Sequence, residues 1–540
     1  MHLTYLLEGK EYKIDKPNEL ISFVQSEEDN RFYLAIKPKK DIVLKQATIV
    51  VPFKINTTDR YFLNGYQSWT DTHLSRVGYV ENSFKRHSHL LRKVFPLDKY
   101  GDVIFYKYRM DRLHSFDVFY SQGENEIYLY NNNYKTAYLI IELQKTKNRL
   151  ILFSDVEKRV IKANETFVIY DYFLSYKYEE GKESFKKKFP KRNIPKLFGY
   201  TSWYNYYQNI NKEIILRDLS ALDDRFDLFQ IDDGYETFVG DWLDIDPIKF
   251  PNGLKPIIDK IHAKNLKAGI WLAPFVAEEK SKLFQEHKEY FRLDESGNPI
   301  KVGVNWSGQY VLDIENEEVI KYIKKCLQYY IDLGFDFFKL DFLYAVNVPN
   351  DYTLTRSEIS QKAYELLKDI LKDKIILGCG ATLFNSIGNF DYLRVGPDMT
   401  LTFDDVLYMR MMHRERPSTK VTIQNTIYRS FMDQRLFGND PDVFLLRDEN
   451  TKLTIEQRKA LVYMDALFGS LLLTSDDIAT YKDIQKDILS YALRLYYEAE
   501  DVNYKVCHKN VHVNYLLDGV RHSFIYHINK GILTDEKEEK

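Results

Sequence analysis

The hydrophobic pattern of this chain changes after about residue 178. Before that point, apolar and polar residues alternate in short runs such as Arg31–Ile36, Ala47–Phe53 and Ala137–Leu143, separated by Asn, Gly, Asp and Lys turns. Many short strands with few helical patterns are typical of a β-sandwich. We therefore predict an N-terminal β-domain over residues 1–178, followed by a charged linker over 179–196 that contains at least one helical turn.

Beyond the linker, short apolar runs alternate with longer segments of helical periodicity, such as Glu317–Tyr330 and Ser357–Leu371. This alternation indicates βα units around a parallel sheet. The predicted strands lie at 198–203, 228–232, 268–273, 335–341, 375–379, 392–396, near Leu436, and at 471–475. Eight such units fit a (β/α)8 TIM barrel, which we place at residues 197–478.

The pattern becomes strand-like again after the barrel, at Val511–Tyr515 and Ser523–Ile528. The sequence given ends in a charged run from Asp535 to Lys540. We predict a C-terminal antiparallel β-domain over residues 479–540, including this charged tail. The predicted fold class is therefore multidomain, α/β plus β, with a TIM barrel between two β-domains.

Composition narrows the range of partners. The 540 residues include 76 Lys and Arg against 79 Asp and Glu, and this balance removes the main electrostatic argument for nucleic acid or an anionic membrane as a partner. The first residues lack an apolar core of signal-peptide length, and no apolar run approaches the length of a membrane span. The three cysteines are widely spaced, which argues against a disulfide framework. We expect a cytoplasmic protein that acts on a neutral small molecule.

Three of the predicted barrel strands end in carboxylates, namely Asp232 with Asp233, Asp341, and Asp398. The inward positions of a barrel are filled by aliphatic side chains, so polar residues at the C-terminal ends of its strands indicate chemistry rather than packing. Two suitably placed carboxylates suffice to break a glycosidic bond. We therefore expect these acids to meet in one active site.

Two of these strand ends also carry a cation. Lys339 and Asp341 lie two residues apart on a predicted strand and share a face, so the ammonium group would pair with the carboxylate and keep it ionised, as a nucleophile must be. A structural ion pair is an equal alternative for this motif alone. Arg394 and Asp398 flank a Gly-Pro turn, which would direct Asp398 to the barrel mouth as a general acid or leave it as a turn cap.

The remaining candidates suit sugar binding. Asp232 and Asp233 would accept hydrogen bonds from hydroxyl groups, although an isolated Asp-Asp-Gly segment is also a common helix N-cap. The five tryptophans are Trp69, Trp203, Trp242, Trp271 and Trp306. Trp203 and Trp271 lie in strand-end segments, where an indole face can pack on a sugar ring, whereas core packing is the better interpretation of Trp306.

A metal or cofactor site has little support in the motifs. None of the 12 histidines falls in the strand-end segments, which disfavours a zinc site, while an all-oxygen magnesium site stays open. The chain contains no Walker-type loop, Gly-x-Ser-x-Gly elbow or dinucleotide fingerprint. We expect an enzyme that uses neither a metal nor a cofactor.

Taken in their order along the chain, several segments resemble glycoside hydrolase family 36 of clan D, the α-galactosidase family, and in particular its compact bacterial and archaeal members. These segments are Asn64–Trp69, Gly199–Tyr204, Gln230–Tyr235, Gly240–Trp242, Gly269–Pro274, Lys339–Asp341, Gly378–Gly380, Arg394–Asp398 and Asn439–Asp442. The resemblance implies an N-terminal β-supersandwich, a (β/α)8 barrel and a C-terminal β-domain.

The resemblance also implies roles for individual residues. Asp341 matches the family's nucleophile and Asp398 its acid/base, while Asp232 and Asp233 match the acids that hold the 4- and 6-hydroxyls of galactose. The other matches are Lys339 near the 3- and 4-hydroxyls, Arg394 and Cys379 beside the 2-position, Trp203, Tyr204 and Trp271 in the aromatic wall, and Trp69 at the mouth.

The implied function is exo-acting hydrolysis of terminal α-linked galactose from melibiose- or raffinose-type sugars by a retaining double displacement, in a monomer or small homo-oligomer. Three alternatives stay open. The small residues at 378–381 leave space for an N-acetyl group at the 2-position, as an α-N-acetylgalactosaminidase requires. A galactosyl transferase and a non-catalytic sugar-binding protein are the other two.

Overall fold

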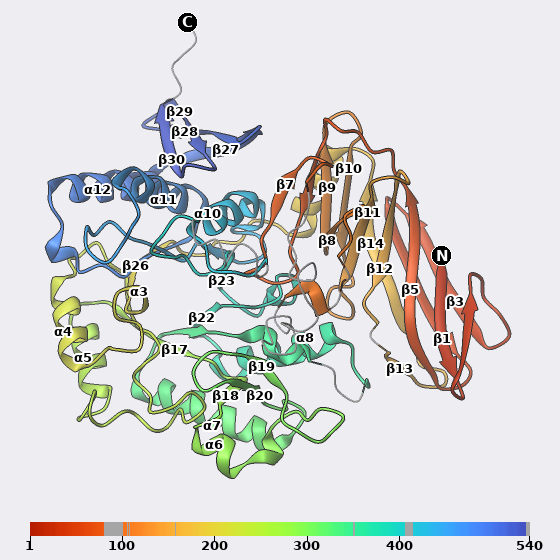
Figure 1. Ribbon diagram of the computed structural model, residues 1–540, viewed down its shortest axis with the longest axis horizontal. Coiled ribbons are helices and arrows are strands. Elements are labelled where there is room, and N and C mark those ends of the chain that lie inside the picture. Colours follow the sequence, from red (N-terminus) through yellow and green to blue (C-terminus); the bar gives the residue numbers. More distant parts are fainter. Residues whose placement is uncertain are drawn as a thin grey trace, which may run out of the picture.

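The computed structural model describes residues 1–79, 101–104, 106, 108–156, 158–348, 352–404 and 414–535. Three regions follow one another along the chain: two β-sheets, a parallel barrel surrounded by helices, and a small antiparallel sheet (Figure 1). The red and orange strands of the first region stand beside the barrel, and the blue C-terminal sheet lies over helices of the barrel. The predicted fold class is confirmed.

The first region is a sandwich of two antiparallel sheets. One sheet has the order β2-β1-β5-β12-β11-β8, with β13 beside β5, and the other has the order β3-β4-β14-β10-β9-β6-β7. Their bounds are β1 (His2–Leu7), β2 (Lys10–Ile14), β3 (Ile21–Glu28), β4 (Arg31–Pro38), β5 (Ile42–Pro52), β6 (Arg60–Leu63), β7 (His73–Ser75), β8 (Arg112–Phe116), β9 (Val118–Gln122), β10 (Ile127–Asn131), β11 (Leu139–Gln144), β12 (Arg149–Ser154), β13 (Val160–Ile161) and β14 (Phe167–Ser175). Leu34 and Phe119 of one sheet and Ile141 and Leu152 of the other are fully buried in a common core. The alternation of inward apolar residues builds this core.

The second region is a barrel of parallel strands. They are β15 (Leu197–Thr201), β16 (Leu228–Ile231), β17 (Lys267–Leu272), β21 (Phe337–Leu340), β22 (Ile375–Gly378), β23 (Tyr392–Arg394), β24 (Gly438–Asp440), β25 (Val443–Phe444) and β26 (Leu471–Thr474). β24 pairs with β23 and β25 pairs with β26. Because Pro441, which has no N–H, and Asp442 are all that separate β24 from β25, the two form halves of one strand that closes the ring. The eight predicted strands are all present, and the seventh begins two residues after Leu436.

Helices connect these strands and cover the barrel. They are α3 (Trp203–Tyr206), α4 (Lys212–Ala221), α5 (Lys255–Ala263), α6 (Lys282–Glu286), α7 (Glu317–Leu333), α8 (Arg356–Leu371), α10 (Thr419–Tyr428), α11 (Ile455–Phe468) and α12 (Asp483–Glu498), and α2 (Tyr178–Lys188) lies in the predicted linker. α7 and α8 confirm the two helices predicted from periodicity. Asn316 caps the start of α7 through its side chain, and Gly334 ends it at a φ of 108° that favours glycine. Among the described helices, none combines the length and apolar character needed to cross a bilayer.

A small sheet is inserted at the C-terminal end of the barrel, directly after β17. It has the order β18-β20-β19, with β18 (Val276–Glu278), β19 (Lys301–Gly303) and β20 (Gln309–Val311). The turn between β19 and β20 carries Asn305 and Trp306, and Trp306 adopts a left-handed φ of 53°. The insertion therefore brings these two side chains over the ends of the barrel strands.

The third region is an antiparallel sheet of β27 (Glu500–Cys507), β28 (Asn510–Leu517), β29 (Val520–His527) and β30 (Ile532–Asp535). The C-terminal β-domain predicted over 479–540 also includes α12. Since α12 follows β26 in the βα order and packs against α11, we propose that it belongs to the barrel and that the β-domain begins after it. Residues 536–540 of the predicted tail lie outside the described residues.

A buried arginine joins the first region to the barrel. Arg429, at the end of α10, donates to the carbonyl oxygens of Ser68 at 2.5 Å, Thr70 at 3.1 Å and Val395 at 2.7 Å. Burial, together with the nearby positive charge of Arg414, lowers its pKa to about 9. These bonds satisfy buried backbone carbonyls, and they hold the segment containing Trp69 against the barrel.

Candidate active site

A cavity of about 280 Å³ opens at the C-terminal end of the barrel. Its lining combines acids, aromatic rings and amides, namely Trp203, Gln208, Asp232, Asp233, Trp271, Asn305, Trp306, Lys339, Asp341, Phe342 and Asp398. Seven of the sequence-predicted residues are among them. The acids follow β16, β21 and β23, which bring together residues far apart in the sequence.

Asp232 is fixed by donors on three sides. Its Oδ2 accepts from the Lys339 ammonium at 2.8 Å, the Gln230 amide at 2.8 Å and the Thr201 hydroxyl at 3.2 Å. Burial alone would lower the pKa of Lys339, but the Asp232 carboxylate outweighs it, so the pKa is raised above its ordinary value. The expected ion pair of Lys339 with Asp341 is therefore wrong, because the long side chain reaches across to Asp232 from an alternate strand of the barrel.

Asp341 is held by two hydrogen bonds. Its Oδ1 accepts from the backbone N–H of Phe342 at 2.8 Å, and its Oδ2 accepts from Trp271 Nε1 at 3.1 Å. Burial raises its pKa to about 6, assisted by the negative charge of Asp398 and opposed by Lys339. The cation thus moderates this pKa without bringing it to the ordinary value, because the desolvation of the carboxylate is larger.

Asp398 lines the same cavity as Asp341 and is more open to solvent. Its side chain is 43% exposed, and its Oδ1 lies 3.4 Å from an Arg394 nitrogen. The N–H of Ser418 donates to its backbone carbonyl at 2.9 Å. Both the side chain and the backbone of Asp398 are therefore tied to neighbouring segments.

Three predicted residues lie behind the cavity wall instead of lining it. Arg394 is buried between Asp440, at 2.6 Å, and Asp442, at 2.8 Å. The Tyr204 hydroxyl donates to Asp442, and Cys379 is buried, which raises the pKa of its thiol. These three side chains therefore pack behind the residues that line the cavity.

Asp233 is oriented by groups that sequence reasoning missed. The Gln208 amide donates to its Oδ1 at 3.1 Å, and Trp306 Nε1 donates to its Oδ2 at 3.0 Å. Burial raises the pKa of Asp233. Trp306 packs against the core as expected, but a left-handed turn in the inserted sheet also brings it over the cavity. No strand-end signal marks Gln208, Asn305 or Trp306, because none of them follows a barrel strand directly.

Trp69 reaches the mouth from the N-terminal region. It lines a smaller cavity of about 120 Å³ with Tyr344, and this cavity shares Asn305, Phe342 and Asp398 with the first one. Its ring packs against Phe342 at a centroid distance of 5.4 Å. Gly380 makes the approach possible, because a Cβ there would lie 3.0 Å from the indole, at a φ of 61°. Asp398 therefore borders both cavities.

The described residues include no group of three or more His, Cys, Asp or Glu side chains arranged to hold a metal ion. The site provides two carboxylates whose pKa is raised by burial, Asp233 and Asp341, a more exposed carboxylate, Asp398, and acceptors with fixed orientations. This set suits acid–base chemistry on a polyhydroxylated molecule.

Residues 174–373 match the family model described as Melibiase. This part of the chain is therefore similar to Melibiase domains. It contains Asp232, Asp233, Lys339 and Asp341, whereas Asp398 lies beyond the matched residues. The expected resemblance to glycoside hydrolase family 36 is confirmed by this match together with the structures below.

Curated relatives of the chain align over short stretches. The chain is 31% identical over 159 residues to an A type blood alpha-D-galactosamine galactosaminidase of Flavonifractor plautii, covering 25% of this chain and 14% of that protein. It is 33% identical over 100 residues to alpha-galactosidase 1 of Pediococcus pentosaceus, covering 17% of this chain and 13% of that protein. The chain therefore spans a small part of the length of these curated relatives.

Solved structures align over nearly the whole chain. The alpha-galactosidase TtGalA from Thermus thermophilus, in complex with stachyose, has 24% sequence identity and a TM-score of 0.70, covering 91% of this chain and 99% of that one. The GH36 alpha-galactosidase AgaA from Geobacillus stearothermophilus has 10% identity and a TM-score of 0.61, covering 94% of this chain and 72% of that one. These likenesses show a shared fold that includes the regions on both sides of residues 174–373.

The Lys339–Asp232 pair yields a prediction about stability. Lys339→Met leaves a buried carboxylate without its counter-ion, so we expect a loss of about 3 kcal/mol or more in the free energy of unfolding. Adding Asp232→Asn should recover part of that loss, because neither partner is then an unpaired charge. Thermal unfolding of Lys339→Met, Asp232→Asn and the double variant measures this coupling, with Lys267→Met at an exposed position as the control. Strictly additive losses would contradict it.

Proposed function

We propose that this protein is an exo-acting retaining α-galactosidase that removes terminal α-linked galactose from melibiose- or raffinose-type sugars. The observation that carries the proposal is that Asp341 and Asp398 line one cavity, together with the oriented acceptors Asp232 and Asp233. The names of the relatives support it, since TtGalA was solved with stachyose and an AgaA variant with raffinose. We also propose a cytoplasmic location and a monomer or small homo-oligomer, as expected from the sequence.

The size of the site favours action at a chain end. A volume of about 280 Å³ is near the lower limit of ligand pockets, which is ~300 Å³. Such a cavity suits a single sugar ring, and the adjoining cavity beside Trp69 and Tyr344 offers a place for the leaving group. Asp398 borders both, which is where an acid must lie to protonate the oxygen between the two sugars.

In the proposed mechanism, the Asp341 carboxylate attacks the anomeric carbon and forms a glycosyl ester, while Asp398 gives its proton to the leaving oxygen. Asp398 then takes a proton from water, which attacks the same carbon and releases Asp341. Trp271 and the Phe342 N–H orient the two oxygens of Asp341. Asp232 and Asp233 accept hydrogen bonds from sugar hydroxyls, with Lys339, Gln208 and Trp306 fixing their direction.

A second candidate is hydrolysis of an α-linked galactosamine derivative. The relative from Flavonifractor plautii is named a galactosamine galactosaminidase, and small residues surround Cys379 where the resemblance places the 2-position. Comparing kcat/KM for 4-nitrophenyl α-galactoside and its N-acetylgalactosaminide counterpart separates the two candidates. Preference for the galactoside supports the proposal, and preference for the amino sugar supports the second candidate.

The nucleophile is tested by removing its carboxylate. Asp341→Ala should lower kcat on 4-nitrophenyl α-galactoside by about a thousandfold or more, because no glycosyl ester can form. Azide, a small nucleophile that fits the vacated space, should restore part of the activity and yield a galactosyl azide. A variant that keeps substantial activity without azide would refute the assignment of Asp341.

The acid is tested by changing the leaving group. Asp398→Ala should lose roughly 100-fold more kcat/KM on melibiose than on 4-nitrophenyl α-galactoside, because nitrophenolate departs without a proton. Steady-state kinetics with the two substrates measure this difference. Equal losses would show that Asp398 does not donate the proton.

The raised pKa of Asp341 predicts a pH dependence. Below its pKa of about 6 the carboxyl is protonated and cannot attack, so kcat/KM on 4-nitrophenyl α-galactoside should rise with pH through about 6. Asp398→Asn removes a negative charge that raises the pKa of Asp341. In this variant, the rise of kcat/KM with pH should therefore occur at a lower pH. If kcat/KM of this variant rises at the same pH as that of the unaltered protein, the electrostatic coupling of the two acids is contradicted.

A further inference from the structure

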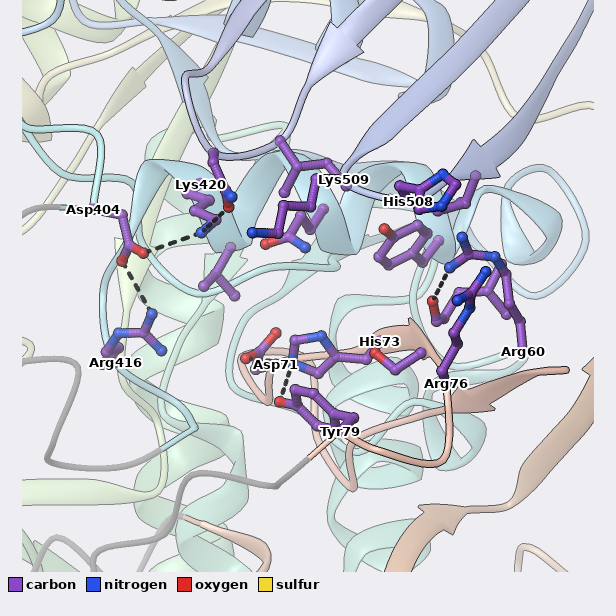
Figure 2. Close-up of a pocket in the computed structure, with 18 residues that line it drawn as sticks. Arg60, Asp71, His73, Arg76, Tyr79, Asp404, Arg416, Lys420, His508 and Lys509 are labelled. Carbon is purple, nitrogen blue, oxygen red and sulfur yellow. Dashed lines mark hydrogen bonds and ion pairs between the residues drawn. The ribbon is translucent and has the colours of Figure 1, made fainter. Parts of the chain in front are cut away.

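A larger cavity, of about 680 Å³, lies where the three regions meet (Figure 2). It is formed by β6 and β7 of the sandwich, α10 of the barrel, and the turns β27–β28 and β29–β30 of the C-terminal sheet. It shares no lining residue with the catalytic cavity. We call it the basic cavity, because its lining includes Arg60, Arg76, Arg416, Lys420 and Lys509.

The basic cavity concentrates positive charge in a chain whose formal net charge is −3. Its two carboxylates, Asp71 and Asp404, are already engaged. Asp71 Oδ2 lies 2.7 Å from His73 Nε2. Asp404 contacts Arg416 at 3.0 Å and Lys420 at 3.7 Å. Asp404 thus contacts two of the five cations and Asp71 contacts His73, which leaves an excess of positive charge.

The remaining cations are Arg60, Arg76 and Lys509, and Figure 2 shows Arg60 and Arg76 side by side. Within the described ranges, no carboxylate lies within ion-pair distance of these three side chains. Arg60 donates to the Leu74 carbonyl at 3.4 Å. Burial lowers the pKa of Arg60, and the charge of Arg76 acts in the same direction. Like charges gathered in a partly enclosed space repel one another, and a bound anion would relieve that repulsion.

The basic cavity is linked to the catalytic site by the segment before α10. Glu415 and Pro417 line the small cavity beside Asp398, whereas Arg416 lines the basic cavity. Ser418, which follows Pro417, donates its N–H to the backbone carbonyl of Asp398. A ligand held by Arg416 would therefore contact the same segment that positions the proposed acid.

We propose that the basic cavity binds a small phosphate-bearing molecule, such as a sugar phosphate. The planar fork of arginine matches phosphate oxygens, and two such forks lie together here. A volume of about 680 Å³ falls in the range of ligand pockets and exceeds what one phosphate needs. Gln424 and Asn529 on the lining offer polar groups for an attached organic part.

The test measures binding directly and does not depend on catalytic activity. Isothermal titration calorimetry of the full chain uses two probes, glucose 6-phosphate and inorganic phosphate, with unphosphorylated glucose as the blank. The double variant Arg76→Gln/Lys509→Gln should weaken binding at least tenfold. The control Lys54→Gln/Lys267→Gln removes the same charge from exposed positions elsewhere, and it should bind as the unaltered protein does.

The outcomes separate the possible ligands. Tighter binding of glucose 6-phosphate than of phosphate supports an organic phosphate, and equal binding supports recognition of the phosphate group alone. Absence of binding for both probes, or equal weakening in the control variant, would overturn the proposal. A further titration uses an oligo-Glu peptide, and binding of that peptide in place of either probe would also overturn the proposal and indicate a protein partner. Since glycosidase activity is not the measurement, failure here leaves the proposed function untouched.

Discussion

The balance of buried charge at the barrel mouth is the constraint on which the site depends. Asp232, Asp440 and Asp442 are almost inaccessible to water, and unpaired carboxylates in such positions cost several kcal/mol each. Lys339 pairs with Asp232, and Arg394 is shared by Asp440 and Asp442, of which burial still raises the pKa of Asp442 to about 7. Lys339 lies in β21 and Arg394 ends β23. The barrel strands therefore place these cations beside the acids, and the ion pairs in turn stabilise the arrangement of the strands.

This arrangement leaves Asp341 with an incomplete counter-charge. Its neighbours donate neutral hydrogen bonds from Trp271 and the Phe342 backbone, while the nearest cation is engaged by Asp232. The result is a carboxyl whose pKa lies closer to neutrality than that of an exposed aspartate. Asp398, at a more open position beside Arg394, lies in a different environment. The two acids therefore lie in unlike surroundings, and the raised pKa belongs to Asp341.

The regions outside the barrel shape the site without supplying its acids. Arg429 ties the segment of Ser68 and Thr70 to the barrel, and Gly380 leaves room for Trp69 at the mouth. The inserted sheet places Trp306 on Asp233. The C-terminal sheet closes one side of the basic cavity. Each region therefore contributes contacts that the barrel strands cannot make.

The sequence by itself determined the three regions, the eight barrel strands and the strand-end acids, because period-two alternation, βα alternation and turn residues are local signals. Only the tertiary structure decided that Lys339 pairs with Asp232 and not with Asp341, that Tyr204 and Arg394 lie behind the cavity, and that Trp306 faces Asp233. The partner of a long side chain depends on which strands are neighbours in the closed ring. The surroundings of Trp306 depend on a left-handed turn in an inserted sheet. Neither is encoded in the spacing of residues along the chain.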